Sequence, residues 1–478
     1  MSEIEFFKEH LKHPLFQIIR DAADEMNSPV YVVGGYVRDM LLERIDNVND
    51  IDILIIGSGI DLAYRVKNKL KGASKVSIFK TYGTAMIKWG DIDIEFVGAR
   101  KESYSLESRN PNVLKGTLED DQKRRDFTIN TLGIQLNSIF FGKFIDPFNG
   151  FEDLKNKIIK TPLNPESTFL DDPLRMLRAI RFSCQLNFSI SKESILAIKS
   201  NSKRIEIISK ERIVEELNKI LMSNIPSKGF LLLDELDLLR FILPELIDLK
   251  GIDEVEGQKH KDNFYHTLEV LDNITSHTDN LWLRWAALLH DIGKASTKKF
   301  NKKIGWTFHG HEYVGSKMIN KVFKRLKMPL NDKIKYVQKI VLMSSRPVIL
   351  SKKTISDSAI RRLIFEAGNH IDDLITLCES DITTKNPKRF KLYHDNFKIV
   401  RKKIKEVEGR DQIRNFQPPI SGEDIMNCFN LKPCKEIGII KESIKESIIE
   451  GKIINDYDQA FKLMLELGKK MNLKKKNE

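Results

Sequence analysis

Residues 30–56 constrain the fold of this chain more than any other segment, because two β-type runs flank a pair of glycines. The apolar run 30–33 stops at Gly34 and Gly35, and a short helix is expected to follow. Glycine lets backbone approach a ligand closely, and the start of a helix offers free N–H groups to phosphate. The segment therefore predicts a strand and a phosphate-binding turn at the beginning of an α/β domain.

Carboxylates stand at the start of the second run. Asp50 and Asp52 are two residues apart, so on a strand they point to the same face. The same period places three acids of a second strand, residues 91–97, on one face: Asp91, Asp93 and Glu95. If the two strands pair side by side, three carboxylates can hold two Mg²⁺ ions about 4 Å apart. An Asp-x-Asp pair alone is more often a turn or a solvated face, but the glycines upstream favour metal-dependent nucleotidyl transfer.

The length and composition indicate a protein of several domains. With 478 residues, 41% hydrophobic and 31% charged, the chain is expected to form two to four globular domains. Its net charge of +12 is typical of a protein with a polyanionic partner such as nucleic acid. The four cysteines form no Cys-x-x-Cys pair, which predicts reduced thiols and a cytoplasmic location. Without an apolar signal core or a run of 18 apolar residues, neither secretion nor a membrane span is expected.

The periodicity changes along the chain. Residues 1–28 show helical spacing, and the polar segment 100–116 is typical of a mobile loop. From residue 165 onward the pattern is helical. Between these regions, short β-rich runs are predicted at residues 30–33, 52–56, 76–79, 84–88, 91–97, 134–136 and 144–145.

Five motifs follow one another in a set order. They are Gly-Gly-Tyr-Val-Arg-Asp (34–39) with Asp-Ile-Asp (50–52), Arg-Arg-Asp-Phe-Thr-Ile-Asn (124–130), Ile-Asp-Pro-Phe-Asn-Gly (145–150), Asp-Pro-Leu-Arg-Met-Leu-Arg-Ala-Ile-Arg-Phe (172–182) and Lys-Glu-Arg-Ile-Val-Glu-Glu-Leu (210–217). In this order they resemble class II tRNA nucleotidyltransferases, the CCA-adding enzymes and their bacterial poly(A) polymerase relatives. The resemblance is dense over residues 30–222. It implies an α+β fold, with a polymerase-β-like head on a small mixed sheet, an all-α neck, an HD-type helical domain and a helical tail.

The resemblance also implies roles for single residues. Asp50 and Asp52 would be metal ligands, and Glu95, five residues before Arg100, would be the third catalytic carboxylate. The nucleotide-binding residues would be Gly34, Gly35, Arg38, Arg125, Asp126, Asn130, Asp172, Arg175, Arg178 and Arg181.

Two of these residues are expected to read the incoming base. Asp172 and Arg175 are three apart on one predicted helix and would share a face. Asp accepts hydrogen bonds from an exocyclic amine and Arg donates to ring nitrogen or carbonyl, so the pair could read the Watson–Crick edge of CTP or ATP. Taken alone, the helix fits an amphipathic element with surface arginines equally well.

A second constellation lies in residues 260–385. His266, His290, Asp291 and the distal Asp381 offer nitrogen and oxygen donors for one transition metal, and Asp291 could bridge to a second. With His-Asp-Ile-Gly-Lys at 290–294, the pattern resembles the HD metal-dependent phosphohydrolases and implies Ni²⁺, Mn²⁺ or Co²⁺. Two-metal members carry a further histidine where this chain has Met343. A second metal, and the choice between hydrolysis and a structural role, therefore stay open.

The expected division is an N-terminal helix (1–28), a catalytic head (29–155), a nucleotide-selecting and RNA-binding neck (156–250), an HD-type metal domain (251–385) and a basic helical tail (386–478). The basic stretch 385–414 fits either a solvated helix face or a surface that binds tRNA phosphates. The predicted function is template-independent, Mg²⁺-dependent addition of CCA to tRNA 3′ ends from CTP and ATP by two-metal phosphoryl transfer. The alternatives are a poly(A) polymerase, an enzyme adding only CC or only A, and an HD phosphohydrolase with an RNA-binding head.

Overall fold

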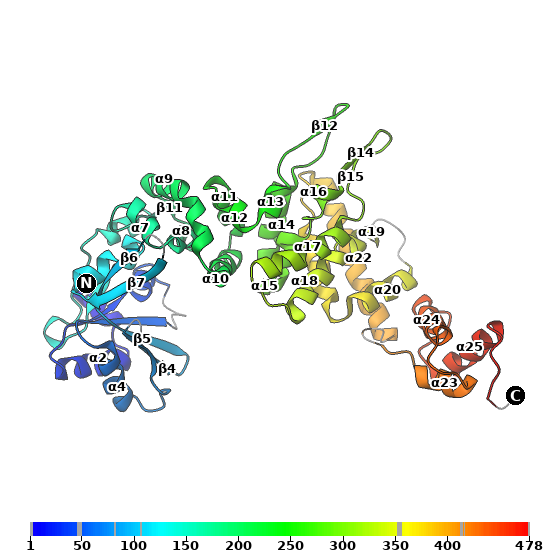
Figure 1. The fold of residues 1–478 in the computed structure, drawn as a ribbon, viewed down its shortest axis with the longest axis horizontal. Helices are drawn as coiled ribbons and strands as arrows, with labels where there is room; N and C mark the ends of the chain where they lie inside the picture. The colour runs from blue at the N-terminus through cyan, green and yellow to red at the C-terminus, as the bar shows by residue number, and fades with distance from the viewer. Residues whose placement is uncertain are drawn as a thin grey trace. The chain divides into compact units, whose positions relative to one another are not determined.

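The computed structural model describes residues 3–44, 50–80, 83–105, 108–350, 356–411, 414 and 416–476. The chain forms two compact units, Met1–Ser223 with Lys228–Ile242, and Asn224–Ser227 with Leu243–Glu478. The first unit combines a sheet with helices and the second is mainly helical (Figure 1). The five-part domain division stays a prediction. Among the described residues, no helix is both long and apolar enough to cross a membrane.

The first unit is built on a mixed sheet of seven strands in the order β3-β4-β5-β2-β1-β8-β9. The strands are β1 (Val30–Val33), β2 (Asp50–Ile55), β3 (Ser77–Phe79), β4 (Thr84–Trp89), β5 (Ile92–Gly98), β8 (Gly133–Gln135) and β9 (Phe144–Ile145). β2 and β5 pair in parallel, whereas the other neighbours pair antiparallel. Each β-rich run predicted from the sequence is confirmed as a strand of this sheet.

One face of the sheet is covered by α1 (Glu3–His10), α2 (Pro14–Glu25) and α4 (Gly59–Lys69), as Figure 1 shows for α2 and α4. Alternate residues of β2 and β5 pack against these helices: Ile51, Ile53, Ile55, Ile94 and Phe96. Side chains alternate along a strand, so Asp50, Asp52 and Glu95 point to the opposite face. There Tyr31 and Leu54 belong to a small separate apolar cluster. The carboxylates thus stand on the face opposite α1, α2 and α4.

The N-terminal segment forms two helices rather than the single predicted helix. Pro14 begins α2, because its ring fixes a helical φ and it has no N–H for the preceding turn to use. His13 Nδ1 accepts a hydrogen bond from Leu15 N at 3.3 Å and caps the new helix.

The expectation of a mobile loop at residues 100–116 is wrong. This segment forms an antiparallel hairpin of β6 (Arg100–Ser105) and β7 (Ser108–Lys115). Strand pairing needs only backbone groups, so a polar sequence does not prevent it. A Cβ on Gly116 would lie 2.7 Å from the Arg100 carbonyl carbon, which explains why glycine closes the base of the hairpin.

The neck helices follow the sheet in the same unit. They are α7 (Pro165–Asp171), α8 (Leu174–Leu186), α9 (Lys192–Asn201), α10 (Lys210–Leu221), α11 (Pro226–Glu235) and α12 (Leu239–Ile242). Short strands β10 (Ile158–Ile159) and β11 (Ser189–Ile190) pair in parallel at the entrance to the neck. Asn164 and Ser191 accept backbone hydrogen bonds at the starts of α7 and α9, so the sequence itself marks where these helices begin.

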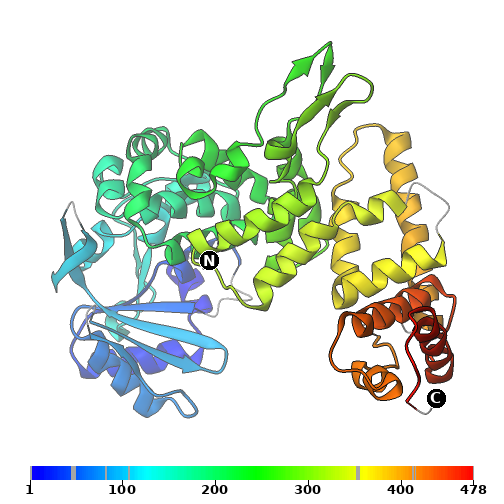
Figure 2. The same ribbon diagram turned by 45° about the vertical axis from the view of Figure 1, so that its right-hand side comes forward.

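The second unit contains α14 (Asn263–Thr275), α15 (Leu281–Leu289), α17 (His311–Arg325), α18 (Asp332–Met343), α20 (Asp357–Ala367) and α21 (Ile371–Ser380). The 25-residue α22 (Pro387–Asp411) and the tail helices α23 (Gly422–Phe429), α24 (Lys435–Glu450) and α25 (Tyr457–Lys470) follow. Two hairpins, β12 (Glu254–Val255) with β13 (Gln258–Lys259) and β14 (Lys299–Asn301) with β15 (Gly305–Thr307), lie side by side (Figure 2). Trp306 Nε1 donates to Gln258 O at 3.1 Å and joins them.

Candidate functional site

The parallel pairing of β2 and β5 brings the predicted carboxylates together. Asp50 lies opposite Asp93, and Asp52 lies opposite Glu95. Lys88 Nζ lies 3.8 Å from Asp93 Oδ1, so Asp93 has a cation of its own on the neighbouring strand. Glu95 instead faces Asp52, which agrees with its choice as the third carboxylate. Period 2 correctly places Asp93 and Glu95 on one face, whereas Asp91 precedes β5, and the pairing of the two strands is confirmed.

Burial and mutual repulsion disfavour the ionised form of the carboxyl groups in this acidic group. Burial raises the pKa of Asp52 to about 6, Asp50, Glu95 and Asp121 add to the rise, and Arg125 partly opposes it. Burial also raises the pKa of Asp50, with Asp93 adding to the rise and Lys219 opposing it. A divalent cation would relieve this repulsion, so the donor set fits such an ion.

Gly34 brings the first turn against the acidic group. Its φ of +75° and ψ of −131° suit glycine, and a Cβ there would lie 3.0 Å from Arg125 Nη1 and 3.1 Å from Asp52 Oδ2. Arg125 Nη1 donates to Asn130 O at 3.1 Å, and its Nε donates to Asp121 Oδ2 at 3.1 Å. A glycine, a guanidinium and a carboxylate therefore meet at the end of β1, where α3 (Gly35–Leu41) begins.

A buried polar chain runs behind this turn. Arg38 Nη1 donates to Asn130 Oδ1 at 2.8 Å, and Asn130 Nδ2 donates to Asp126 Oδ1 at 3.0 Å. Arg178 Nε donates to Asp126 Oδ2 at 2.6 Å and so ties α8 to the head. Burial opposes ionisation of Asp126, but Arg178 and the Asn130 amide more than offset it and lower its pKa to about 2. The structure thus joins four of the predicted nucleotide-binding residues in one network.

Asp172 and Arg175 do not share a helix, contrary to the sequence-based expectation. α7 ends at Asp171 and α8 starts at Leu174, because the residue before Pro173 is disfavoured in the helical region. Asp172 Oδ1 accepts from Leu174 N at 3.1 Å, and Arg175 Nη2 donates to Arg124 O at 2.6 Å. Both side chains still lie at the N-terminal end of α8.

Arg181 forms a second tie within the neck. Its Nη1 lies 3.2 Å from both carboxylate oxygens of Glu216 on α10, and both residues are buried. The guanidinium carbons of Arg38, Arg178 and Arg181 lie 5.0, 5.5 and 4.1 Å from the centroid of the Phe182 ring. Three guanidinium groups thus gather around one aromatic ring.

Asp121, Phe182 and Glu216 were not predicted as site residues. For Asp121 a signal existed, because it lies three and four residues before Arg124 and Arg125, the spacing at which helical side chains meet.

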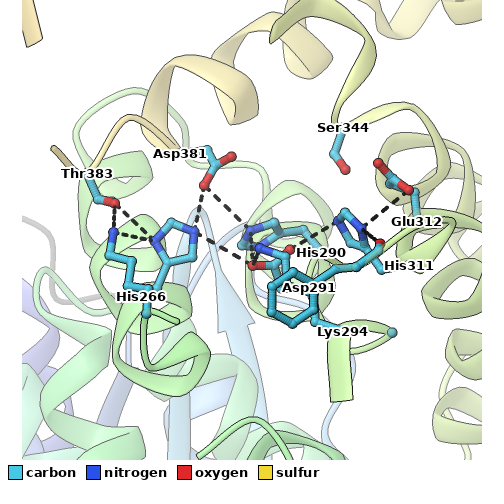
Figure 3. Close-up of polar contacts among 12 residues, drawn as sticks. His266, His290, Asp291, Lys294, His311, Glu312, Ser344, Asp381 and Thr383 are labelled. Carbon is cyan, nitrogen blue, oxygen red and sulfur yellow. Dashed lines mark hydrogen bonds and ion pairs between the residues drawn. The ribbon is translucent and has the colours of Figure 1, made fainter. Parts of the chain in front are cut away.

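In the second unit, the predicted metal ligands converge (Figure 3). His266, His290 and Asp381 place one donor atom each within 4.8 Å of one another, the one such group of three or more His, Cys, Asp or Glu residues in the part of the chain that the structure describes. His266 Nε2 lies 2.8 Å, and His290 Nε2 lies 3.7 Å, from Asp381 Oδ1. His290 Nδ1 donates to Ala287 O at 2.8 Å, which leaves Nε2 to bind a metal. His290 Nε2 and Asp381 Oδ1 are both buried and belong to the same group, so these donors fit a transition metal.

Asp291 lies beside the group and faces the ammonium of Lys294 and the rings of two histidines. Its Oδ2 is 3.3 Å from His290 Nε2 and 2.5 Å from Lys294 Nζ, and its Oδ1 is 3.6 Å from His311 Nε2. Although burial opposes it, His290 and Lys294 hold the pKa of Asp291 well below its usual value. The structure also brings His311, which was not predicted as a site residue, to Asp291 (Figure 3).

A cavity of about 590 Å³ opens at the histidine group. Its polar lining includes Lys261, Lys385 and Asp381, and Tyr393 and Phe397 of α22 form part of its apolar wall. Lys261 Nζ lies 3.3 Å from His266 Nδ1, so a cation stands beside the candidate metal ligands.

Comparison with known proteins gives three family-model matches in chain order. Residues 30–160 match the poly A polymerase head domain, residues 187–249 the probable RNA and SrmB- binding site of polymerase A, and residues 263–364 the HD domain. Among solved structures, the Bacillus stearothermophilus CCA-adding enzyme in complex with CTP superposes with a TM-score of 0.68 at 20% identity, covering 96% of this chain and 99% of that one. This likeness shows the fold, and the predicted α+β architecture is confirmed.

Two curated relatives bear on the family. The A-adding tRNA nucleotidyltransferase of Geobacter sulfurreducens is 37% identical over 263 residues, which is 53% of this chain but 29% of that protein. The multifunctional CCA protein of Pseudomonas fluorescens is 32% identical over 312 residues, 63% of this chain and 71% of that protein. With the head, neck and HD matches in the same order as the motifs, this chain belongs to the family of tRNA nucleotidyltransferases and bacterial poly(A) polymerases.

Proposed function

We propose that this protein adds CCA to the 3′ ends of tRNA, using CTP and ATP without a template. The observation that carries the proposal is the register of β2 and β5, which sets Asp52 opposite Glu95 beside the Gly34 turn and Arg125. A carboxylate group next to a turn that accepts phosphate is what nucleotidyl transfer from a triphosphate requires.

Asp50, Asp52 and Glu95 would hold Mg²⁺ here, in keeping with a family that generally uses divalent metal ions. Mg²⁺ suits this place because it prefers carboxylate and phosphate oxygens and keeps several waters. When bound, it lowers the pKa of the attacking 3′-hydroxyl and neutralises charge on the triphosphate and the leaving pyrophosphate.

The remaining head residues bind and orient the nucleotide. Gly34 and Gly35 let the triphosphate approach the backbone at the start of α3, and Arg125 offers its guanidinium to a phosphate oxygen. Asn130 and Asp126, held by Arg38 and Arg178, form a fixed polar wall for the ribose.

Base selection falls to the N-terminal end of α8. Asp172 and Arg175 would present an acceptor and donors to the Watson–Crick edge of cytosine or adenine. The hydrogen bond from Arg175 to Arg124 O places this edge against the head. Arg178 and Arg181 would hold α8 in position, because Arg178 donates to Asp126 and Arg181 donates to Glu216.

The test is nucleotide addition to a tRNA that lacks CCA, supplied with each nucleoside triphosphate alone and in pairs. We expect addition of two C residues with CTP and of the terminal A once ATP is added. Addition of A alone to a tRNA ending in CC, or of CC alone, would assign a partial enzyme. A long A-tail without use of CTP would assign a poly(A) polymerase.

An acidic substitution tests the residues. Asp52→Asn should abolish incorporation, because a neutral amide cannot replace the carboxylate that would hold Mg²⁺. The fold and tRNA binding should persist, because the change removes a charge that burial already disfavours. Asp61→Asn on α4, which covers the opposite face of the sheet, is the matched control and should keep the wild-type rate. Full incorporation by the Asp52 variant would reject the carboxylate mechanism.

A second candidate activity is metal-dependent phosphoester hydrolysis in the HD domain. The buried His290 Nε2 and the close approach of His266 and Asp381, which line the cavity, favour it. We propose that His266, His290 and Asp381 bind Ni²⁺, Mn²⁺ or Co²⁺, with Asp291 close enough to join them. Metal content of the purified protein and of its Asp381→Asn variant, measured by elemental analysis, tests the site separately from activity. Equal metal content in both would reject it.

A further inference from the structure

The second ring nitrogen of His266 has partners that the proposed metal site does not use. Its Nε2 lies 2.8 Å from Asp381 Oδ1, among the candidate metal ligands. Its Nδ1, at the other end of the ring, lies 3.0 Å from Thr383 Oγ1 and 3.3 Å from Lys261 Nζ. Figure 3 shows Asp381 and Thr383 at opposite ends of the His266 ring, so one short segment contacts both nitrogens of this imidazole.

The helix that carries His266 also holds this segment in place. His266 lies on α14, and Asn273, seven residues later, lies on the same face of that helix. Asn273 Nδ2 donates to Ser380 O at 2.9 Å. The backbone three residues ahead of Thr383 is thus tied to α14, which keeps the Thr383 hydroxyl close to the imidazole.

A histidine binds a metal through Nε2 only when that nitrogen carries no proton. The proton of the neutral ring then lies on Nδ1, which needs a hydrogen-bond acceptor. The Ala287 carbonyl accepts this proton from His290, and at His266 the neighbours of Nδ1 are Thr383 and Lys261. An ammonium has only protons to donate, whereas a hydroxyl oxygen has two lone pairs. The acceptor for the Nδ1–H of His266 is therefore Thr383 Oγ1.

Lys261 supports this arrangement from the other side of the hydroxyl. Its Nζ donates to Thr383 Oγ1, which uses one lone pair and leaves the other for Nδ1–H. The backbone of Lys261 is held by the buried His260, whose Nδ1 donates to Lys261 O at 2.8 Å. The His260 ring packs against Trp306 of β15, with 5.1 Å between the ring centroids. Contacts at the base of the two hairpins thus hold the lysine that keeps the Thr383 oxygen in the acceptor role.

We propose that Thr383 is a positioning residue of the metal site in the HD domain: its hydroxyl accepts the Nδ1–H of His266 and so directs the Nε2 lone pair of that ring to the metal. The inference rests on the metal site proposed above and adds a residue that acts on the ion through His266. Partners of this kind orient the ligand ring and raise its basicity, and their loss costs about 10- to 100-fold in metal affinity.

Three variants of the full-length protein test this. Thr383→Val keeps the shape of the side chain and removes the acceptor, and Thr383→Ser restores a hydroxyl. Thr384→Val is the matched control, because Thr384 lines the same cavity but its hydroxyl accepts from Asn386 N at 3.4 Å. Co²⁺ binding is measured by calorimetric titration, and the titration of Asp381→Asn is subtracted, because that variant keeps only the proposed head site.

For Thr383→Val we expect the Kd for Co²⁺ to rise about 10- to 100-fold. Thr383→Ser should regain most of the affinity, and Thr384→Val should match the wild type. In proton NMR spectra of the Co²⁺-loaded protein in water, the Nδ1–H signal of His266 should weaken in Thr383→Val, because a proton without an acceptor exchanges faster with solvent. The Nδ1–H signal of His290, which donates to Ala287 O, should stay unchanged and is the internal reference.

Two results would overturn the assignment. Wild-type Co²⁺ affinity in Thr383→Val would mean that the hydroxyl does not serve His266, and equal losses in Thr383→Val and Thr384→Val would mean a general effect on the cavity wall. Failure of the proposed metal site itself is distinct, because the wild type would then bind no more Co²⁺ than Asp381→Asn, and the role of Thr383 would fall with it.

Discussion

Gly34→Ala is the substitution whose effect the geometry specifies most closely. At φ +75° and ψ −131° an alanine is expected to cost about 1–3 kcal/mol of backbone strain. The new Cβ would also stand 3.0 Å from Arg125 Nη1 and 3.1 Å from Asp52 Oδ2, so both groups must retreat by some tenths of an ångström. Displacements of about 1 Å in an active site cost about 100-fold in rate, and we expect a 10- to 100-fold loss here.

Gly90→Ala separates strain from displacement. Gly90 also has a positive φ, +60°, but a Cβ there meets nothing within 4 Å. Both variants should lose stability in urea unfolding, and only Gly34→Ala should lose rate in single-turnover addition of a nucleotide to tRNA. If Gly34→Ala keeps the wild-type rate while losing stability as Gly90→Ala does, the contacts of Gly34 with Arg125 and Asp52 do not matter for catalysis.

Three further outcomes are expected, from the buried Asp126, from the candidate metal ligand Asp381 and from Gly116 at the base of a hairpin. Because the pKa of Asp126 is about 2 when folded and 3.8 in the reference state, its ionised form contributes roughly 2 kcal/mol of stability above pH 4, which is lost as the pH falls from about 4 to 2. Asp126→Asn should flatten this part of the curve of unfolding free energy against pH, and an unchanged slope would contradict it. Removal of metal by a chelator should lower the Tm of the wild-type protein more than that of Asp381→Asn, which keeps only the proposed head site, as linkage requires for a ligand of the folded state. Gly116→Ala should destabilise the β6–β7 hairpin, seen as faster amide exchange in residues 100–105, because its Cβ would meet the Arg100 carbonyl carbon at 2.7 Å; exchange at the wild-type rate would mean that the hairpin absorbs the contact.

The sequence was most informative where strand period alone decides orientation. Ile51, Ile53 and Ile55 are buried against the helices on one face of the sheet. Because side chains alternate along a strand, Asp50 and Asp52 point to the opposite face. Local pattern did not reveal which strand would lie beside β2. Parallel pairing with β5 joins residues more than forty positions apart, and such a long-range pairing is not encoded in the spacing of either strand.

Prediction failed where one residue overrode a longer pattern. Pro173 separates Asp172 from the helix that the apolar spacing of α8 suggests, and Pro14 divides the N-terminal helix in the same way. In the second unit the candidate ligands His266, His290 and Asp381 come from α14 and from the residues that follow α15 and α21, and their distances depend on packing that no local spacing encodes. The likeness to a known motif supplied that grouping, which the positions alone did not.

Asp126 links the chemical half of the site to the selecting half. Its two carboxylate oxygens are used in different directions, one by Asn130 and one by Arg178. Asn130 belongs to the head and is joined to Arg38 behind the Gly34 turn, whereas Arg178 belongs to α8, the helix proposed to read the base. A buried carboxylate whose pKa is lowered to about 2 stays ionised through the neutral range, so the ion pair of Asp126 with Arg178 persists throughout that range. A substitution that weakens it should therefore change the ratio of CTP to ATP use before it lowers the rate of either, because the edge that reads the base would move relative to the carboxylates that serve both nucleotides.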